Sequence, residues 1–288
     1  PKLYTLKVEV LKNGEVIDEE SARIGFRTFS IDAEKGFFLN GRPLKIKGTC
    51  NHQDHAGVGV AVPDSVQYYR IQRLKDMGTN AYRCSHNLPN KEILDACDEL
   101  GMIVMDENRR FESRDEVLEY LDIMVRRDRN HPSVIIWSLG NETAMGPNFL
   151  KAYQWVRSTD PTRPIQFEQA GTGDGTDIFC PMYLSVADCK KYLDSGAAKP
   201  LILCEYNHTM GNSGGNLADY WELVRQYPSF QGGFDWDFAD QALHRHSLKP
   251  MGVRPDGMSY SDLRKIEYCY GGDYNEYDPS DNNFNCNG

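Results

Sequence analysis

From Asn40 onward the sequence alternates short apolar runs with stretches of helical periodicity, and this alternation constrains the fold more than any other feature. It is typical of βα units, in which helices cover a parallel sheet. The eight candidate strands are 44–48, 80–83, 103–106, 134–138, 165–167, 178–181, 201–204 and 232–236. Eight such units close into a barrel, so we predict an α/β fold, a (β/α)8 TIM barrel, over residues 32–288.

Predicted helices fill the intervals between these strands. The segment 90–100 has an apolar stripe and is followed by Gly101, and the segment 64–77 is followed by Gly78. Glycine just beyond a periodic segment is a common helix terminator, because it adopts the left-handed conformation without strain. Strand and helix therefore alternate in the order that a parallel barrel requires.

Residues 1–31 have a different pattern. Apolar and polar residues alternate there in the β manner on both sides of Asn13-Gly14, a pair that favours a tight hairpin turn. Two strands alone are only marginally stable. We therefore predict that 1–31 is the C-terminal hairpin of an immunoglobulin-like β-sandwich domain, whose earlier strands would precede this chain.

Charge and composition limit the partners. The net charge of −10 and the pI of about 5.2 disfavour nucleic acids and anionic membranes. No apolar run approaches the roughly 20 residues that span a bilayer. The eight cysteines form no CxxC pair, which predicts free thiols and no structural zinc. We expect a small-molecule substrate, no nucleic-acid or membrane partner, and a cytoplasmic location, with the periplasm as the alternative.

Nearly every predicted strand is followed by polar residues. These groups are 51–55, 83–86, 106–108, 141–142, Glu168, Tyr183, 205–208 and 235–237. Any one of them could be an ordinary solvated loop. In a barrel, however, the carboxyl ends of all strands meet at one mouth, where active sites are built. The whole set therefore predicts a site at that mouth.

Two glutamates in these groups could act as a pair of carboxyl groups in hydrolysis. Glu142 and Glu205 each follow an apolar strand, so both are expected at the depth of the mouth. Hydrolysis of a glycosidic bond needs one protonated and one ionised carboxyl, and a pair about 5 Å apart lets the ionised one attack carbon. A glutamate after a strand is also often a surface ion-pair partner, so spacing alone leaves both interpretations open.

Longer motifs around these glutamates resemble a known family. The segment 127–142, RDRNHPSVIIWSLGNE, is similar to the acid/base signature of family 2 glycoside hydrolases, the β-galactosidase, β-glucuronidase and β-mannosidase group. The segment 200–213, PLILCEYNHTMGNS, resembles the nucleophile segment of the bacterial β-galactosidases in that family. The resemblance extends from about Phe26 to Gly288.

The resemblance implies a role for individual residues. Glu142 would protonate the leaving oxygen, and Glu205 would form the glycosyl-enzyme. Asn141 would bind the sugar 2-hydroxyl, where a contact that tightens in the transition state aids catalysis. The remaining sugar-binding residues implied are His52, His86, Tyr183, His208 and Trp236. Each histidine could instead be a hydrogen-bonded structural residue, and Trp236 or Tyr183 could simply close the barrel. Arg83 and Asp106 are expected to orient their neighbours, and the roles of Glu107 and Glu168 stay open.

The family pattern is incomplete at its metal sites. Well-studied bacterial β-galactosidases of the family carry a glutamate and a histidine a few residues after the third strand that hold magnesium together with the acid/base. Here residues 105–113 contain no histidine, and Glu112 matches the glutamate only with a shift. Phe284 and Asn287 fall on a pattern associated with sodium binding. The chemistry requires no cofactor, and Mg²⁺ and Na⁺ are the candidate ions.

These observations predict a retaining exo-β-galactosidase that hydrolyses terminal β-D-galactosides by double displacement. A β-glucuronidase or another family 2 β-glycosidase is the alternative within the class. A carbohydrate-binding or inactive barrel fragment is the alternative of another class, although the pair of glutamates disfavours it. The resemblance also implies a homo-oligomeric parent protein.

Overall fold

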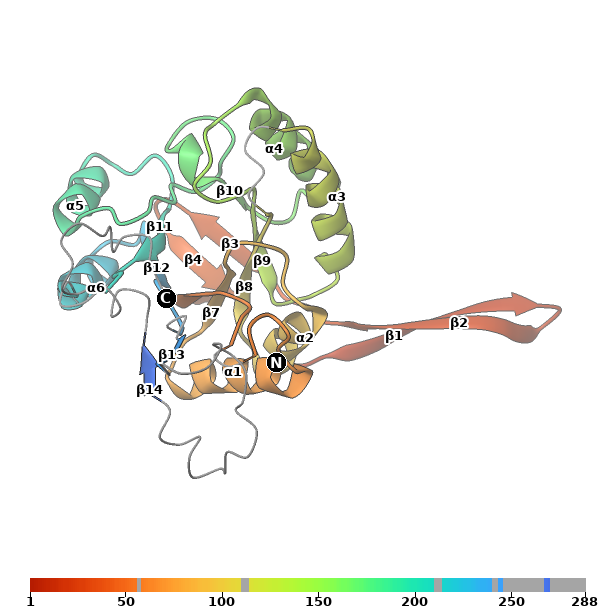
Figure 1. Ribbon diagram of the computed structural model, residues 1–288. Coiled ribbons are helices and arrows are strands. Elements are labelled where there is room, and N and C mark those ends of the chain that lie inside the picture. Colours follow the sequence, from red (N-terminus) through yellow and green to blue (C-terminus); the bar gives the residue numbers. More distant parts are fainter. Residues whose placement is uncertain (56–57, 110–113, 210–213, 240–242, 246–266, 270–288) are drawn as a thin grey trace.

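The computed structural model describes residues 1–55, 58–109, 114–209, 214–239, 243–245 and 267–269. Parallel strands form its centre (Figure 1). In chain order they are β6 (Ile46–Asn51), β7 (Ala81–Cys84), β8 (Ile103–Glu107), β9 (Val134–Ser138), β10 (Ile165–Gln166), β11 (Leu201–Tyr206) and β12 (Phe230–Asp235). Consecutive strands pair from β6 to β10, and β12 pairs with both β11 and β6, so the last strand returns to the first.

The sixth predicted strand, 178–181, completes the ring without forming a regular strand. Isolated bridges join this part of the chain to β11, one of them between Met182 and Glu205. A backbone hydrogen bond joins its other side to β10. Pro181 has no N–H to contribute to a ladder, which explains the intermittent pairing. The other seven predicted strands are present, and the predicted (β/α)8 barrel is confirmed.

Helices cover the outside of the ring (Figure 1). They are α1 (Asp64–Asp76), α2 (Lys91–Leu100), α3 (Glu116–Asp128), α4 (Pro147–Thr159), α5 (Val186–Asp194) and α6 (Leu217–Gln226). In α2, Ile93, Leu94 and Cys97 are buried against the ring. Gly101 ends the helix at φ +75°, and its N–H donates to the Cys97 carbonyl at 2.9 Å. The two helices predicted at 64–77 and 90–100 are therefore confirmed to within a residue or two at each end.

The core has an inner and an outer layer because strand side chains alternate. On β8, Ile103 and Met105 belong to the cluster inside the ring, whereas Val104 packs in the cluster beneath the helices. Both faces of the strands are covered, so β8 is buried along its whole length. This rigid support fixes the strand ends that carry the site.

A small antiparallel sheet closes the amino end of the ring. It consists of β3 (Phe29–Asp32), β4 (Gly36–Leu39) and β5 (Arg42–Pro43). Phe37 of β4 packs in the inner cluster, and its N–H donates to Gln231 Oε1 near the start of β12 at 2.8 Å. Apolar side chains from this sheet thus fill the end of the ring that is opposite to the mouth.

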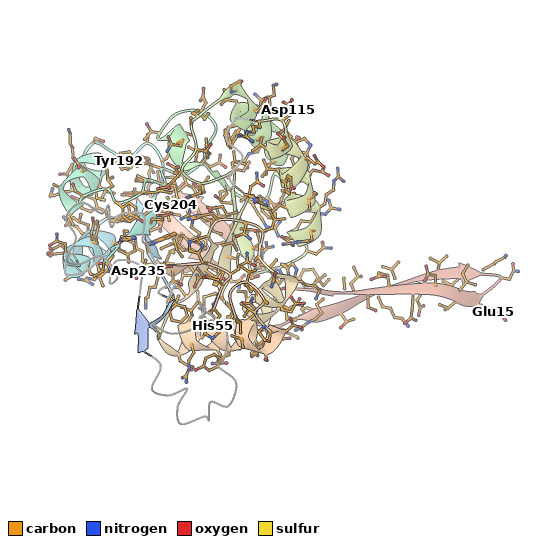
Figure 2. The ribbon with its side chains drawn as sticks, viewed as in Figure 1. Glu15, His55, Asp115, Tyr192, Cys204 and Asp235 are labelled. Atoms are coloured by element: carbon orange, nitrogen blue, oxygen red, sulfur yellow. The ribbon has the colours of Figure 1, made fainter. Side chains whose placement is uncertain are left out.

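The first two strands, β1 (Tyr4–Lys12) and β2 (Glu15–Ile24), form a long antiparallel hairpin that projects away from the barrel (Figure 1). Figure 2 shows Glu15 at its far tip. Nearly all of its residues are exposed, including Leu11 and Ile17. The predicted turn at Asn13-Gly14 connects its strands.

Two short strands, β13 (Leu243–Arg245) and β14 (Glu267–Cys269), pair with each other near the end of the chain. Over the described part of the chain, none of the helices has the length and apolarity needed to cross a bilayer. The six cysteines with described side chains are buried and free.

Candidate active site

The carboxyl ends of the parallel strands meet at one mouth, and the strands deliver their polar residues to it. Figure 2 labels Cys204 of β11 and Asp235 of β12, which lie on two neighbouring strands. Glu205 follows Cys204 directly and is buried, with 3% of its surface exposed. Glu142 follows β9 and is exposed. The two glutamates therefore combine a buried carboxylate with one that faces the solvent side of the mouth.

Both oxygens of the Glu205 carboxylate are held by donors. Arg83 Nη1 donates to Oε1 at 2.7 Å, and the Tyr183 hydroxyl donates to Oε2 at 2.6 Å. Burial of the Tyr183 hydroxyl, followed by its hydrogen bond to Glu205, raises its pKa, so Tyr183 stays protonated and acts as a donor. One donor on each oxygen thus holds the carboxylate in one orientation.

Arg83 organises this end of the barrel. It is fully buried, and its guanidinium also donates to Glu107 Oε2 at 2.9 Å and to Asn141 Oδ1 at 2.7 Å. Burial opposes its charge, but Glu107 and the other partners more than offset this and raise its pKa well above the usual value. The expectation that Arg83 orients its neighbours agrees with these contacts. One permanent cation therefore links Glu205 to Asn141, the residue next to Glu142.

Glu107, at the end of β8, contacts both Arg83 and His86. It is fully buried and accepts hydrogen bonds from Arg83, from Ser138 Oγ at 2.8 Å and from His86 Nδ1 at 2.7 Å. Burial alone would raise the pKa of Glu107, but the charge of Arg83 and the contact with His86 lower it below the usual value. An ionised Glu107 thus orients both Arg83 and His86, a role that the sequence left open.

Aromatic rings form a wall around Trp236. The ring of His86 stacks on Trp236 with centroids 5.1 Å apart, and His52 meets Trp236 edge-on at 5.3 Å. His208 lies over Trp236 at 6.3 Å and contacts Tyr183 at 5.9 Å. The structure thus brings together the five predicted sugar-binding residues on this wall, and Arg83 links the sixth, Asn141, to Glu205. A sugar ring can stack its C–H face on such a surface.

Glu142 is fixed through its backbone. Its φ is +43°, and its N–H donates to Glu168 Oε1 at 2.8 Å. Burial raises the pKa of Glu168. The sequence placed Glu168 at the mouth without a role, and it gave no signal for this contact because a loop conformation brings the two residues together.

Sequence reasoning also missed Ser138, which donates to Glu107 and accepts from Gln166 Nε2 at 2.5 Å. A signal for it exists. Ser138 lies two residues after Ile136, which packs inside the ring, so strand alternation places its hydroxyl inside as well.

The described residues do not fit the magnesium site of the bacterial β-galactosidases. Glu107, the acidic residue at the end of the third strand, is committed to Arg83, His86 and Ser138. No histidine follows it within 105–113. Glu112, Phe284 and Asn287 lie outside the described residues. We therefore derive no chemical step that depends on a metal.

A separate cluster of Asp95, Asp98 and His131 has atoms close enough to hold a metal ion. His131 Nδ1 already bonds to Asp98 Oδ2 at 2.7 Å, and Asp98 Oδ1 accepts the Ser133 N–H at 2.9 Å. Asp98 belongs to α2 and Ser133 precedes β9, so these bonds join a helix to the amino end of the barrel. They are structural contacts away from the mouth.

The parallel barrel and its polar mouth place the chain in the class of TIM-barrel proteins with a site at the carboxyl ends of the strands. Comparison with models of known families identifies the family within this class. The family model described as "Glycosyl hydrolases family 2, TIM barrel domain" matches residues 30–114 and 109–288, and the model "Glycosyl hydrolases family 2" matches residues 1–27. The chain belongs to glycosyl hydrolase family 2.

Similar proteins agree with this assignment. A β-galactosidase from Enterobacter cloacae is 38% identical over all of this chain and 29% of its own length. A family 2 member from Bacteroides cellulosilyticus is 32% identical with a TM-score of 0.72, over 82% of this chain and 34% of that one. β-Glucuronidase 3 from Bacteroides uniformis is 25% identical with a TM-score of 0.70, over 88% of this chain and 39% of that one. The chain thus spans about a third of the length of these proteins.

Proposed function

We propose that the chain carries the catalytic site of a retaining exo-β-galactosidase, which hydrolyses terminal non-reducing β-D-galactosides. The observation that carries the proposal is the fixed carboxylate of Glu205, held by Arg83 and Tyr183 at 2.7 and 2.6 Å. The same Arg83 holds Asn141, the neighbour of Glu142. One cation thereby holds the buried nucleophile and the residue next to the exposed proton donor.

The reaction proceeds in two displacements. In the first, Glu205 attacks the anomeric carbon, the bond from this carbon to the leaving oxygen breaks, and Glu142 gives its proton to that oxygen. In the second, Glu142 takes a proton from water, the water oxygen attacks the anomeric carbon, and Glu205 leaves as a carboxylate. Two inversions at one carbon retain its configuration.

Asn141 and the aromatic wall position the sugar. The Asn141 Oδ1 accepts from Arg83, so its Nδ2 group can donate to the sugar 2-hydroxyl. The axial 4-hydroxyl of galactose leaves a continuous C–H face on the other side of the ring, which suits contact with the aromatic wall around Trp236. The similarity to the Enterobacter β-galactosidase supports the choice of sugar.

A β-glucuronidase is the second candidate, because a structural relative carries that name. A glucuronide carboxylate needs a cationic partner. Arg83 is committed to Glu107, Glu205 and Asn141, and Asp235 and Asp237 on either side of Trp236 would repel a second carboxylate. These charges favour a neutral sugar.

Two measurements test the proposal. Nitrophenyl β-galactoside should be hydrolysed much faster than the matching glucuronide, and dominant glucuronide turnover would overturn the choice of sugar. A 2-deoxy-2-fluoro-galactoside with a good leaving group should label the peptide that contains Glu205, as detected by mass spectrometry. Binding of galactosides with neither labelling nor turnover would instead support a carbohydrate-binding barrel.

A further inference from the structure

The backbone of Glu142 has an unusual conformation. Its φ of +43° lies in the left-handed region, where the Cβ of a residue other than glycine is crowded. Such a conformation persists only where surrounding contacts hold it, and it often marks a functional position. The contact that holds Glu142 is therefore of mechanistic interest.

The carboxylate of Glu168 makes this contact. Its Oε1 accepts the Glu142 N–H at 2.8 Å. Glu168 begins the short 3-10 helix η1 (Glu168–Ala170), and the side-chain amide of Gln169 donates to both of its oxygens, at 3.0 and 2.8 Å. The Gln169 amide thus holds both oxygens of the acceptor, including the one that accepts the Glu142 N–H.

The chain just before Glu168 is rigid. Phe167 is fully buried and stacks on Phe149 of α4 with ring centroids 4.1 Å apart. Gln166 is fully buried as well, and the Leu139 N–H donates to its carbonyl at 3.0 Å. The segment that leads to Glu142 and the segment that leads to Glu168 are therefore fastened together immediately before the two glutamates.

We propose that Glu168 is a positioning residue for the acid/base: by accepting the Glu142 N–H, it holds the left-handed backbone that directs the Glu142 carboxyl at the glycosidic oxygen. The inference rests on the proposed function of Glu142. Glu168 touches neither the sugar nor the reacting atoms in this scheme, and acts through Glu142 alone.

The proposal predicts a defect that depends on the leaving group. A general acid must lie within hydrogen-bond reach of the oxygen it protonates, and a small displacement costs a large part of its effect. An alkoxide leaves slowly without a proton, whereas dinitrophenolate leaves readily without one. Misplacement of Glu142 should therefore slow the cleavage of alkyl glycosides and spare that of dinitrophenyl glycosides.

The experiment compares Glu168→Ala, which removes the acceptor, with Glu168→Gln, which keeps an acceptor oxygen. For Glu168→Ala we expect kcat/KM for an alkyl β-galactoside to fall at least about 30-fold, and kcat/KM for the dinitrophenyl β-galactoside to change by less than about threefold. Glu168→Gln should restore most of the loss. The control Glu119→Ala removes an exposed glutamate of α3 and should change neither.

A second readout concerns the base step. With the dinitrophenyl substrate, kcat of Glu168→Ala should fall and azide should restore it, because azide attacks the glycosyl-enzyme without a base. Equal losses for both substrates, or no loss, would overturn the inference. So would a crystal structure of Glu168→Ala in which Glu142 keeps its positive φ.

Failure of this inference can be told apart from failure of the proposed function. If Glu205→Gln remains active, the nucleophile assignment is wrong, and the inference falls with it. If Glu205→Gln is inactive while Glu168→Ala behaves like the Glu119→Ala control, only the role of Glu168 is refuted.

Discussion

At the scale of single residues, Arg83 determines the geometry of the mouth. Its guanidinium contacts Glu107, Glu205 and Asn141, which come from three different strand ends. All four side chains are at least 96% buried, as the exposed fractions of 0%, 0%, 3% and 4% show. Buried carboxylates are tolerable only while their cation is present. In the proposed reaction, stability and catalytic geometry therefore depend on the same side chain.

Replacing Arg83 by methionine should lower the free energy of unfolding by about 3–5 kcal/mol, because two buried carboxylates lose their partner. Arg83→Lys keeps the charge but cannot make three directed contacts. This variant should therefore be less destabilised than Arg83→Met and still lose most of its activity. Urea denaturation and kcat measurements test this. Arg126→Met, at an exposed pair on α3, is the control and should change stability by less than about 1 kcal/mol. A stable, active Arg83→Met variant would contradict the prediction.

Tyr183 offers a milder change at the same site. Tyr183→Phe removes only the hydroxyl that donates to Glu205 Oε2. We expect kcat to fall about 100-fold, as for the loss of one preorganised donor, while the melting temperature stays nearly constant because Tyr183 is partly exposed. Tyr69→Phe, on the exposed face of α1, is the matched control. A loss of less than threefold would show that Arg83 alone is enough to hold Glu205, the proposed nucleophile.

At the scale of secondary-structure elements, Asp160 fastens a helix end to the barrel. It follows α4, accepts from Trp137 Nε1 of β9 at 2.9 Å, and pairs with Arg163 at 2.5 Å. Arg163 in turn donates to the Val134 carbonyl at 2.8 Å. Burial of Asp160 opposes its ionisation, but Thr162 and Arg163 lower its pKa to about 2. The ionised carboxylate is thus the form that the fold requires.

This link should give the fold a defined acid sensitivity. Because the pKa is lowered from 3.8 to about 2, the stabilisation is complete above pH 4 and is lost as the pH falls towards 2. Asp160→Asn should cost on the order of 2 kcal/mol at pH 7 and roughly half of that at pH 3. Urea denaturation of both proteins at the two pH values measures this difference. A difference that does not change with pH would mean that the ionisation of Asp160 is not what stabilises the link.

At the scale of the whole molecule, the repeated βα pattern predicted the barrel because each strand and helix carries its own periodicity. The sixth strand was less predictable, since Pro181 limits pairing in a way that depends on its neighbours. Strand order also predicted which residues share the mouth. It could not predict which of them touch, because the contacts of Arg83 and the turn that brings Glu168 to Glu142 depend on side-chain conformations and loop geometry.

The hairpin β1–β2 and the barrel should differ sharply in local stability. The hairpin has no described layer over its exposed apolar residues, among them Leu6 and Val8, and two strands alone are marginally stable. The barrel strands β8 and β9 are buried on both faces. Opening the hairpin therefore exposes little additional apolar surface, whereas opening the barrel exposes much.

Hydrogen exchange followed by mass spectrometry can measure this contrast within one sample. Amides of residues 4–24 should exchange at least about 100-fold faster than those of β8 and β9. Equal protection would mean that a second layer covers the hairpin in solution, and a dilution series would then identify a second copy of the chain if protection falls with concentration. Fast exchange of the hairpin at every concentration, with β8 and β9 still protected, would show that the hairpin opens without unfolding of the barrel.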